Sequence, residues 1–166
     1  MIESLSSLSR EQIAEQLQQL LPADQVETAQ EVLDEARVDR FKKYQSVHGL
    51  YTAPRPAAVV SVRSTEEVSR ILAFAQEHRT NIVPRTGRTG TEGGLETSVE
   101  DSIVLDCSAM DGILSIDPEN MQVTVQAGVP LQRLEDTLRA QGLTTGHSPQ
   151  SKPLAQYGGL VATRSI

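Results

Sequence analysis

The sequence of 166 residues contains a single cysteine, Cys107. One cysteine excludes an internal disulfide and a cysteine-based metal site, and it favours a reducing, cytoplasmic compartment. We expect no bound metal. Basic residues are also scarce, because 15 Lys and Arg stand against 22 Asp and Glu and leave a formal charge of −7. No Lys/Arg cluster interleaves with aromatic residues, so nucleic acid and anionic membrane surfaces are poor partners.

Long apolar runs are absent as well. The N-terminus, Met1–Arg10, mixes acidic and basic residues with serines, and the longest apolar stretches elsewhere run only a few residues. The sequence therefore predicts neither a signal peptide nor a membrane span. With 38% hydrophobic and 22% charged residues, the chain is typical of one globular domain with enough apolar side chains to bury a core.

Helical patterns open the chain. Ser9 and Gln12 form a capping-box pattern in front of apolar residues at helical spacing, and Pro22 ends this helix. A second helix is expected over about residues 25–37. We interpret residues 1–54 as an N-terminal helical segment that packs outside the main unit. The pattern is lost between Tyr44 and Pro56, which predicts an irregular connection.

From Ala57 onward, short strands alternate with helices. Strands are expected at residues 59–62, 81–83 and 103–105, and a second capping box at Ser64 and Glu67 begins a helix after the first strand. A strand, a helix and a strand at this spacing favour parallel pairing with a right-handed crossover.

The second half of the chain predicts a hairpin and a helix. Residues 113–116 and 123–127 flank a turn at residues 117–120, as in an antiparallel hairpin. Pro130 suits a first helical residue, and Gly142 suits the C-terminal stop. The fold class is therefore α+β, with a small parallel β-α-β subdomain followed by a mainly antiparallel β subdomain with helices.

A glycine loop, residues 84–94, follows the second of these strands and holds four glycines: Gly87, Gly90, Gly93 and Gly94. Glycine allows positive φ and lets backbone N–H groups converge on an anion such as a diphosphate. The loop lacks the Gly-Lys-Ser/Thr ending of a Walker loop and the spacing of a Rossmann turn, and no amphipathic helix follows it. Judged on its glycine count alone, a plain connecting loop explains it equally well.

Residues 55–166 resemble the FAD-binding domain of the vanillyl-alcohol oxidase and p-cresol methylhydroxylase superfamily, a PCMH-type domain. The resemblance rests on residues 55–60 with 64–68, on the glycine loop, and on residues 146–149 through 158–164, in the family's order and approximate spacing. FAD-linked 2-hydroxy-acid dehydrogenases and alkyl-dihydroxyacetone-phosphate synthases are the closest members in pattern. Similar domains continue beyond the position of Ile166 and are followed by a cap domain, so we expect this domain to be truncated at its C-terminus.

The resemblance implies non-covalent FAD, because the glycine loop has no histidine of the kind from which some relatives tether the flavin; His147 is the less favoured tether. In similar loops a glycine usually stands at the position of Arg88. The residues that the resemblance places on FAD are Pro84, Arg85, Thr86, Gly87, Arg88, Thr89 and Gly90 around the diphosphate, Gln150, Ser151, Gln156, Gly158 and Gly159 along the dinucleotide, and Thr163, Arg164 and Ser165 toward the flavin.

The implied function is oxidation of a small 2-hydroxy acid, of the D-lactate or glycolate type, by hydride transfer to FAD. No carboxylates have the spacing of an acid-base pair, so we assign no catalytic residue and expect the base in a portion beyond Ile166. By itself the 166-residue chain is expected to be inactive. Two alternatives stay open: an alkyl-dihydroxyacetone-phosphate synthase-like enzyme, and a non-catalytic binding module of the same fold. The electron acceptor is not predicted, and a homo-oligomer remains open.

Overall fold

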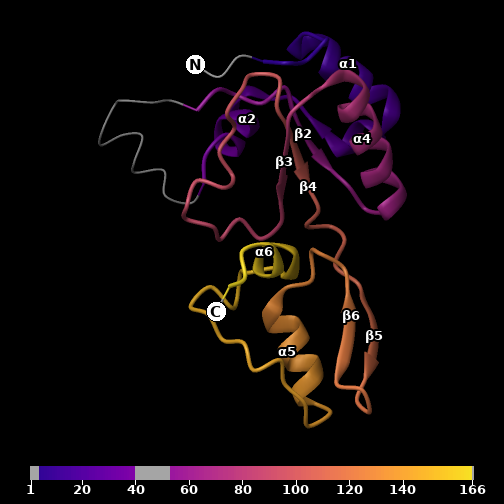
Figure 1. The fold of residues 1–166 in the computed structure, drawn as a ribbon, viewed down its shortest axis with the longest axis vertical. Coiled ribbons are helices and arrows are strands. Elements are labelled where there is room, and N and C mark those ends of the chain that lie inside the picture. Colours follow the sequence, from indigo (N-terminus) through magenta and orange to yellow (C-terminus); the bar gives the residue numbers. More distant parts are fainter. Residues whose placement is uncertain (1–3, 40–52, 166) are drawn as a thin grey trace. The chain divides into compact units, whose positions relative to one another are not determined.

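The computed structural model describes residues 4–39 and 53–165, which divide into two compact units (Figure 1). The first unit comprises Met1–Pro84 and Gly90–Asp106, and the second comprises Arg85–Thr89 and Cys107–Ile166. Residues 85–89 of the glycine loop therefore belong to the second unit, although the first unit surrounds them in sequence. The predicted boundary between residues 54 and 55 does not coincide with this division and stays a prediction.

The first unit is built on a four-stranded sheet of order β1-β2-β4-β3. The strands are β1 (Val26–Glu27), β2 (Ala58–Ser61), β3 (Ile82–Arg85) and β4 (Ile103–Asp106). β2 pairs in parallel with β4, and β1 pairs antiparallel with β2 at the edge. The expected parallel pairing is thus confirmed. It joins β2 to β4, and β3 does not pair with β2. β4, which follows the glycine loop, lies between the two strands that are consecutive in sequence.

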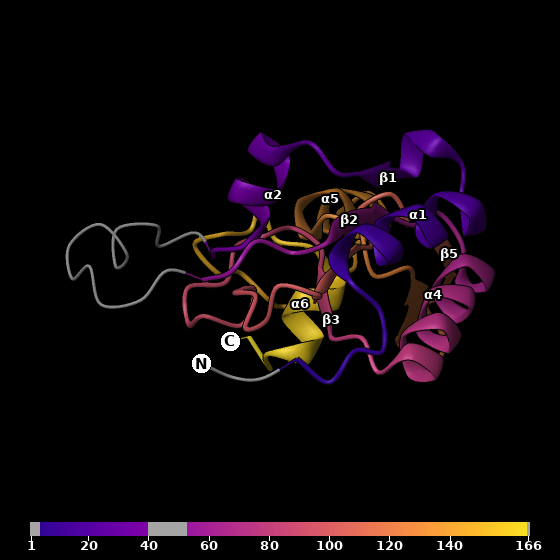
Figure 2. The same ribbon diagram turned by 90° about the horizontal axis from the view of Figure 1, so that it is seen from above.

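Helices cover both faces of this sheet. They are α1 (Arg10–Leu20), α2 (Gln30–Ala36), α4 (Thr65–His78) and a short 3-10 helix, η1 (Ala23–Gln25). α2 lies on one side of the sheet, and α1 and α4 lie on the other (Figures 1 and 2). Leu33 of α2 packs in a buried cluster with Val59 and Val104 of the sheet.

Both predicted helix starts are confirmed. The Ser9 side chain accepts from the backbone N–H of Gln12, and the Gln12 side chain accepts from the N–H of Ser9, which completes the capping box. The Ser64 hydroxyl accepts from the N–H of Glu67 at 3.2 Å. The second box is open, however, because the Glu67 carboxylate accepts from the N–H of Arg63 rather than that of Ser64.

The continuous helix predicted over residues 25–37 is wrong. Val26 and Glu27 extend along β2, with Val26 opposite Val60, and α2 begins only at Gln30. The buried Gln25 side chain donates to Ser61 O at 2.7 Å and to the Glu67 carboxylate at 2.8 Å. Pairing with an open sheet edge therefore outweighs the local helical pattern.

The N-terminal helices are part of the first unit, not outside it, because their chain supplies β1 and the α2 face of the core. Of the predicted irregular connection, residues 44–52 lie outside the described residues. Residues 53–56 form neither helix nor strand.

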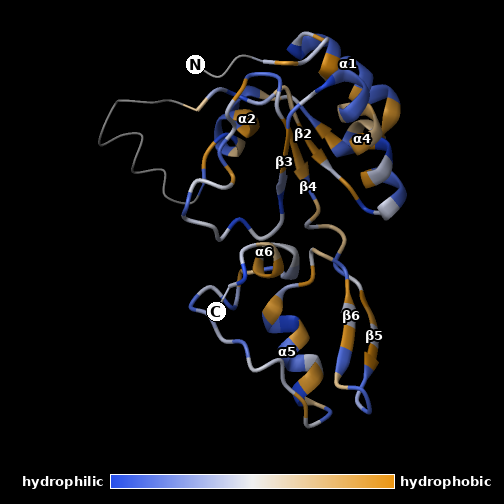
Figure 3. Ribbon diagram, in the orientation of Figure 1, coloured by the Kyte–Doolittle hydropathy of each residue, from blue (hydrophilic) through white to orange (hydrophobic). Residues whose placement is uncertain are grey.

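The second unit consists of a hairpin and two helices. β5 (Ile113–Asp117) and β6 (Gln122–Val125) pair antiparallel, as predicted. α5 (Leu131–Arg139) packs its apolar face on the hairpin, and Figure 3 shows the hydrophobic positions along both elements. Pro130 stands at the N-cap, one residue before its expected place, and Gly142 has φ +75° after the helix. The buried cluster joins Val129, Leu134 and Leu138 to Ile113, Ile116, Val123 and Val125.

The sequence does not predict α6 (Tyr157–Ala162). Two of its six residues are glycines, which weaken helix propensity by about 1 kcal/mol each. The helix ends at Thr163, and Arg164 takes the left-handed conformation with φ 49° that a glycine commonly supplies.

A buried carboxylate, Glu135, lies on α5 with 1% of its surface exposed. Its Oε1 accepts from the backbone N–H of Thr145 at 2.7 Å, and its Oε2 accepts from the Thr144 hydroxyl at 2.9 Å. Burial opposes its ionisation, but hydrogen bonds from Thr145, Thr144 and Arg139 outweigh burial and lower the pKa of Glu135 to about 2.

We expect the free energy of unfolding to decrease in acid because Glu135 becomes protonated. An unfolded glutamate has a pKa of about 4.3, so the unfolded chain binds the proton first as the pH falls. The stabilising contribution is complete above about pH 5 and is lost between there and about pH 2; it amounts to on the order of 3 kcal/mol. Urea unfolding across this range should show a shallower pH dependence of the unfolding free energy in Glu135→Gln than in the unchanged chain. Equal slopes would contradict this assignment.

Candidate functional site

The loop at residues 85–89 is fastened by the segment that follows β4. The backbone N–H of Cys107 donates to Arg85 O at 3.0 Å, and the Ser108 hydroxyl donates to Thr86 O at 3.1 Å. Figure 3 colours β2 and β4 as hydrophobic and the loop after β3 as hydrophilic to intermediate.

Gly87 lies directly against residues 154–156. A Cβ atom at this glycine would lie 2.5 Å from the carbonyl oxygen of Leu154 and 2.9 Å from the backbone nitrogen of Gln156. Both neighbours are backbone atoms, so they cannot turn aside as a flexible side chain can. Only glycine allows the two backbones to approach this closely.

The partner segment is itself held by hydrogen bonds along residues 127–131. Leu131 N donates to Ala155 O at 2.9 Å, Tyr157 N donates to Val129 O at 3.0 Å, and Gly158 N donates to Ala127 O at 2.7 Å. A Cβ atom at Gly158 would lie 2.9 Å from Ala127 Cβ and 3.3 Å from Thr86 Cγ2. The start of α6 is therefore fixed beside the loop.

Several polar groups at this junction have no partner. Within the described part of the chain, the backbone N–H groups of Thr86, Gly87, Thr89 and Gly159 donate to no acceptor. The Oε1 of Gln156 is buried and also unpaired, and the Gln156 Cγ would lie 3.3 Å from a Cβ at Gly87. Buried polar atoms are normally hydrogen-bonded, so the Gln156 Oε1 needs a donor from a ligand. The unpaired backbone N–H groups of the glycine loop suit anionic oxygens.

Arg88 has φ 54°, in the left-handed region. The resemblance identified this position as one where similar loops carry glycine, and the backbone conformation agrees with that expectation. A side chain in this conformation costs on the order of 1–2 kcal/mol, so the loop is strained at Arg88.

The structure brings Thr86 and Gly87 together with Gln156, Gly158 and Gly159, since a Cβ atom at Gly159 would lie 3.5 Å from Thr86 Oγ1. Ser151 O accepts from Leu154 N and Ala155 N, both at 2.8 Å, and so shapes the turn that leads to this junction.

The other predicted residues flank the junction along the chain. Pro84 and Gly90 belong to the first unit on either side of the loop, and Gln150 precedes Ser151 in the turn. After α6, the Thr163 hydroxyl donates to Gly159 O at 2.9 Å and Ser165 N donates to Leu160 O at 2.9 Å, with Arg164 between them.

Sequence reasoning missed Ser108 and Glu135. Ser108 lies in no motif, and its contact with Thr86 O depends on the sheet order. Glu135 resembles any charged residue of an amphipathic helix, and nothing local shows that it is buried.

Among residues 4–39 and 53–165, no group of His, Cys, Asp or Glu is arranged to hold a metal ion. In the same residues, no helix is both long and apolar enough to cross a membrane.

The fold is that of the PCMH-type FAD-binding domains. A solved alkyldihydroxyacetonephosphate synthase matches with a TM-score of 0.80 and 22% identity over 99% of this chain and 36% of that one. A p-cresol methylhydroxylase with bound substrate matches with a TM-score of 0.76 and 22% identity, over 93% of this chain and 29% of that one.

The chain belongs to the FAD binding domain family, whose model matches residues 56–166. It is 61% identical to the FAD-linked oxidoreductase YgcU of Escherichia coli (strain K12) over 160 residues, which are 96% of this chain and 33% of YgcU. It is 36% identical over 121 residues to D-lactate dehydrogenase [cytochrome] 1, mitochondrial, of Saccharomyces cerevisiae, which is 72% of this chain and 20% of that protein. The chain thus spans about a third of the length of YgcU.

We expect Gly87→Ala to weaken FAD binding by about tenfold or more, because the new Cβ must push apart the loop and residues 154–156. Gly94→Ala is the matched control, since a Cβ there meets nothing within 4 Å. FAD titration by flavin fluorescence measures both variants, and circular dichroism confirms that they are folded. Equal affinities would show that the close contact at Gly87 does not support the site.

Arg88→Gly is expected to bind FAD as tightly as the unchanged protein or more tightly. The substitution relieves backbone strain of about 1–2 kcal/mol, whereas a guanidinium paired with phosphate at a partly exposed position such as Arg88 contributes about 0.2–1 kcal/mol in salt solution. FAD titration at low and moderate salt compares the two proteins. A salt-sensitive loss of affinity in the variant would instead make Arg88 a bidentate phosphate ligand.

Proposed function

We propose that residues 85–89 and 150–159 bind the diphosphate of FAD. The observation that carries this proposal is the set of unpaired N–H groups of Thr86, Gly87 and Gly159 beside a backbone contact that only glycine permits. Backbone N–H groups that have no acceptor within the described residues can bind anionic oxygens. Arg85 and Arg88 add positive charge to the same loop.

We assign a different binding role to each part of the site. The loop N–H groups donate hydrogen bonds to phosphate oxygens, and the buried Gln156 Oε1 accepts from a hydroxyl group of the dinucleotide. The hydrogen bonds between residues 127–131 and 155–158 keep the two halves in register. Residues Thr163, Arg164 and Ser165, after α6, are proposed to lie toward the flavin. When bound, FAD supplies the acceptor for a hydride from the substrate.

For the protein as a whole we propose FAD-dependent oxidation of a small 2-hydroxy acid of the D-lactate or glycolate type. The 36% identity to a D-lactate dehydrogenase supports this substrate class. The single cysteine of the chain favours a cytoplasmic location. The described residues supply binding groups, and we assign no catalytic base among them.

The test is flavin reduction without oxygen, in the protein expressed at the full length of its gene. D-lactate or glycolate should bleach the oxidised flavin absorbance, and the 166-residue chain alone should not turn over either acid. Alkyl-dihydroxyacetone-phosphate synthesis involves no net redox change of the flavin, so flavin that stays oxidised with both acids would favour that alternative.

The purified protein should be yellow and should carry FAD rather than FMN, because the site is suited to a diphosphate and FMN has one phosphate. Chromatography of the released cofactor distinguishes them. Acid precipitation should leave the flavin in the supernatant, since we propose a non-covalent cofactor. Flavin in the pellet would refute that part, and His147→Ala would then test the alternative tether.

A further inference from the structure

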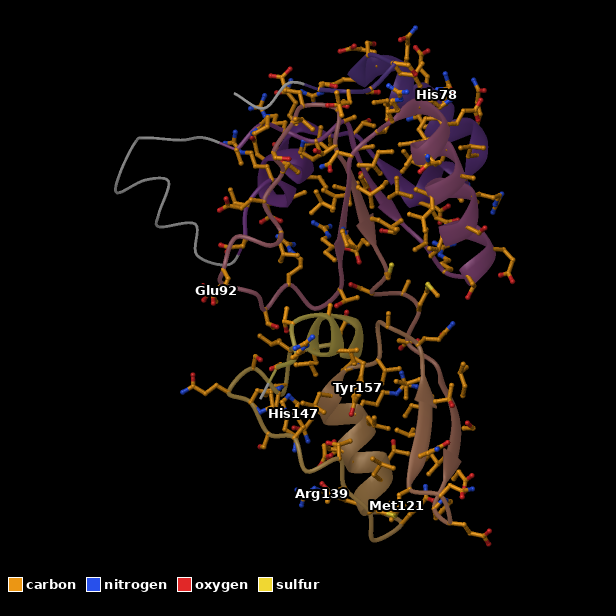
Figure 4. The ribbon with its side chains drawn as sticks, viewed as in Figure 1. His78, Glu92, Met121, Arg139, His147 and Tyr157 are labelled. Atoms are coloured by element: carbon orange, nitrogen blue, oxygen red, sulfur yellow. The ribbon has the colours of Figure 1, made fainter. Side chains whose placement is uncertain are left out.

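Glu135 makes more hydrogen bonds and ion pairs within the second unit than a helix residue usually does. Its carboxylate accepts from the backbone N–H and the hydroxyl of Thr145 and from the hydroxyl of Thr144. Arg139 Nε lies 3.4 Å from its Oε2 on the same helix. Figure 4 labels Arg139, His147 and Tyr157, which belong respectively to α5, to the segment after it and to the start of α6.

The two threonine hydroxyls also accept hydrogen bonds from backbone N–H groups. Because each donates its proton to Glu135, each keeps lone pairs to accept with. Thr144 Oγ1 accepts from Gly146 N at 3.1 Å, and Thr145 Oγ1 accepts from His147 N at 3.2 Å. Gly146 has φ +71°. The carboxylate therefore fixes the turn that leads directly into residues 150–156.

A further contact ties Glu135 to the segment of the proposed cofactor residues. Lys152 has 17% of its side chain exposed, and its Nζ lies 3.8 Å from Glu135 Oε2. Burial raises the pKa of Tyr157, a hydrogen bond with Thr145 opposes that rise, and the Glu135 charge adds to it. Glu135 thus holds residues 144–147 by hydrogen bonds and lies within ion-pair distance of Lys152.

Stability alone does not account for a carboxylate here. Burying an ion costs several kcal/mol per group, and well-packed apolar side chains of similar volume often stabilise a fold as well or better. What a buried carboxylate adds is a defined arrangement of the groups around it.

We propose that Glu135 is a positioning residue for the FAD site: through Thr144, Thr145 and Lys152 it sets the conformation of residues 144–152 and so holds residues 150–156 against Gly87. This inference rests on the proposed FAD-binding function. Glu135, Thr144 and Thr145 themselves lie outside the residues proposed to bind FAD.

The test compares FAD affinity in variants that perturb this network with a variant that perturbs only the core. Glu135→Gln removes the charge at nearly constant volume, and Leu138→Ala, on the same helix, removes a buried side chain of the apolar cluster. FAD titrations are made where circular dichroism and urea unfolding show each protein to be folded, and the loss of stability is measured for each.

Glu135→Gln should weaken FAD binding by about tenfold, while folded Leu138→Ala should bind as the unchanged protein does. Lys152→Met should weaken binding less. The double variant Glu135→Gln/Lys152→Met should bind no more weakly than Glu135→Gln alone, because both changes release the same segment. The circular dichroism of bound flavin should change in Glu135→Gln and not in Leu138→Ala.

If Glu135→Gln does not fold, Thr145→Val decides the matter, since it removes one hydroxyl of the network and should weaken FAD binding several-fold. Unchanged affinity in the folded network variants would overturn the inference, as would an equal loss in Leu138→Ala at equal loss of stability. If the unchanged protein binds no FAD, the proposed function fails instead.

Discussion

The contact between the backbone at Gly87 and the backbone of Leu154 and Gln156 is the constraint on which the site depends. It joins two segments that lie almost seventy residues apart, and a Cβ at 2.5 Å from a carbonyl oxygen leaves no room for any other residue. Because the contact uses no hydrogen bond of the loop, the N–H groups of Thr86, Gly87 and Thr89 have no acceptor among residues 4–39 and 53–165. Close packing and unpaired donors are therefore two results of one arrangement.

Elements with strong local signals could be predicted from the sequence. The Ser9 capping box, the helix start at Ser64 and the hairpin around Asp117 each depend on a few neighbouring residues, and the structure confirms them. Features set by distant residues could not be predicted in this way. β1 is a strand because the edge of β2 is open to it, and β4 lies between β2 and β3 because of the sheet as a whole.

The candidate site likewise has features that the sequence predicted and features that it could not predict. Glycines predicted the loop, and the resemblance paired it with residues 150–159, but neither could show that Gly87 meets Leu154 or that Ser108 holds Thr86. The left-handed conformation of Arg88 followed from knowing where similar loops have glycine. The burial of Glu135 could not be foreseen, since a glutamate on a short amphipathic helix is ordinarily solvated.

The division of the chain has a consequence for how the protein can be cut. The second unit takes residues 85–89 from within the sequence of the first, so the chain passes between the units at residues 84/85, 89/90 and 106/107. No single cleavage separates two complete units: a polypeptide beginning at Cys107 would have the hairpin, α5 and α6 but lack the loop. Such a piece would regain the missing half of the proposed phosphate-binding surface only by complementation with a peptide that supplies residues 85–89.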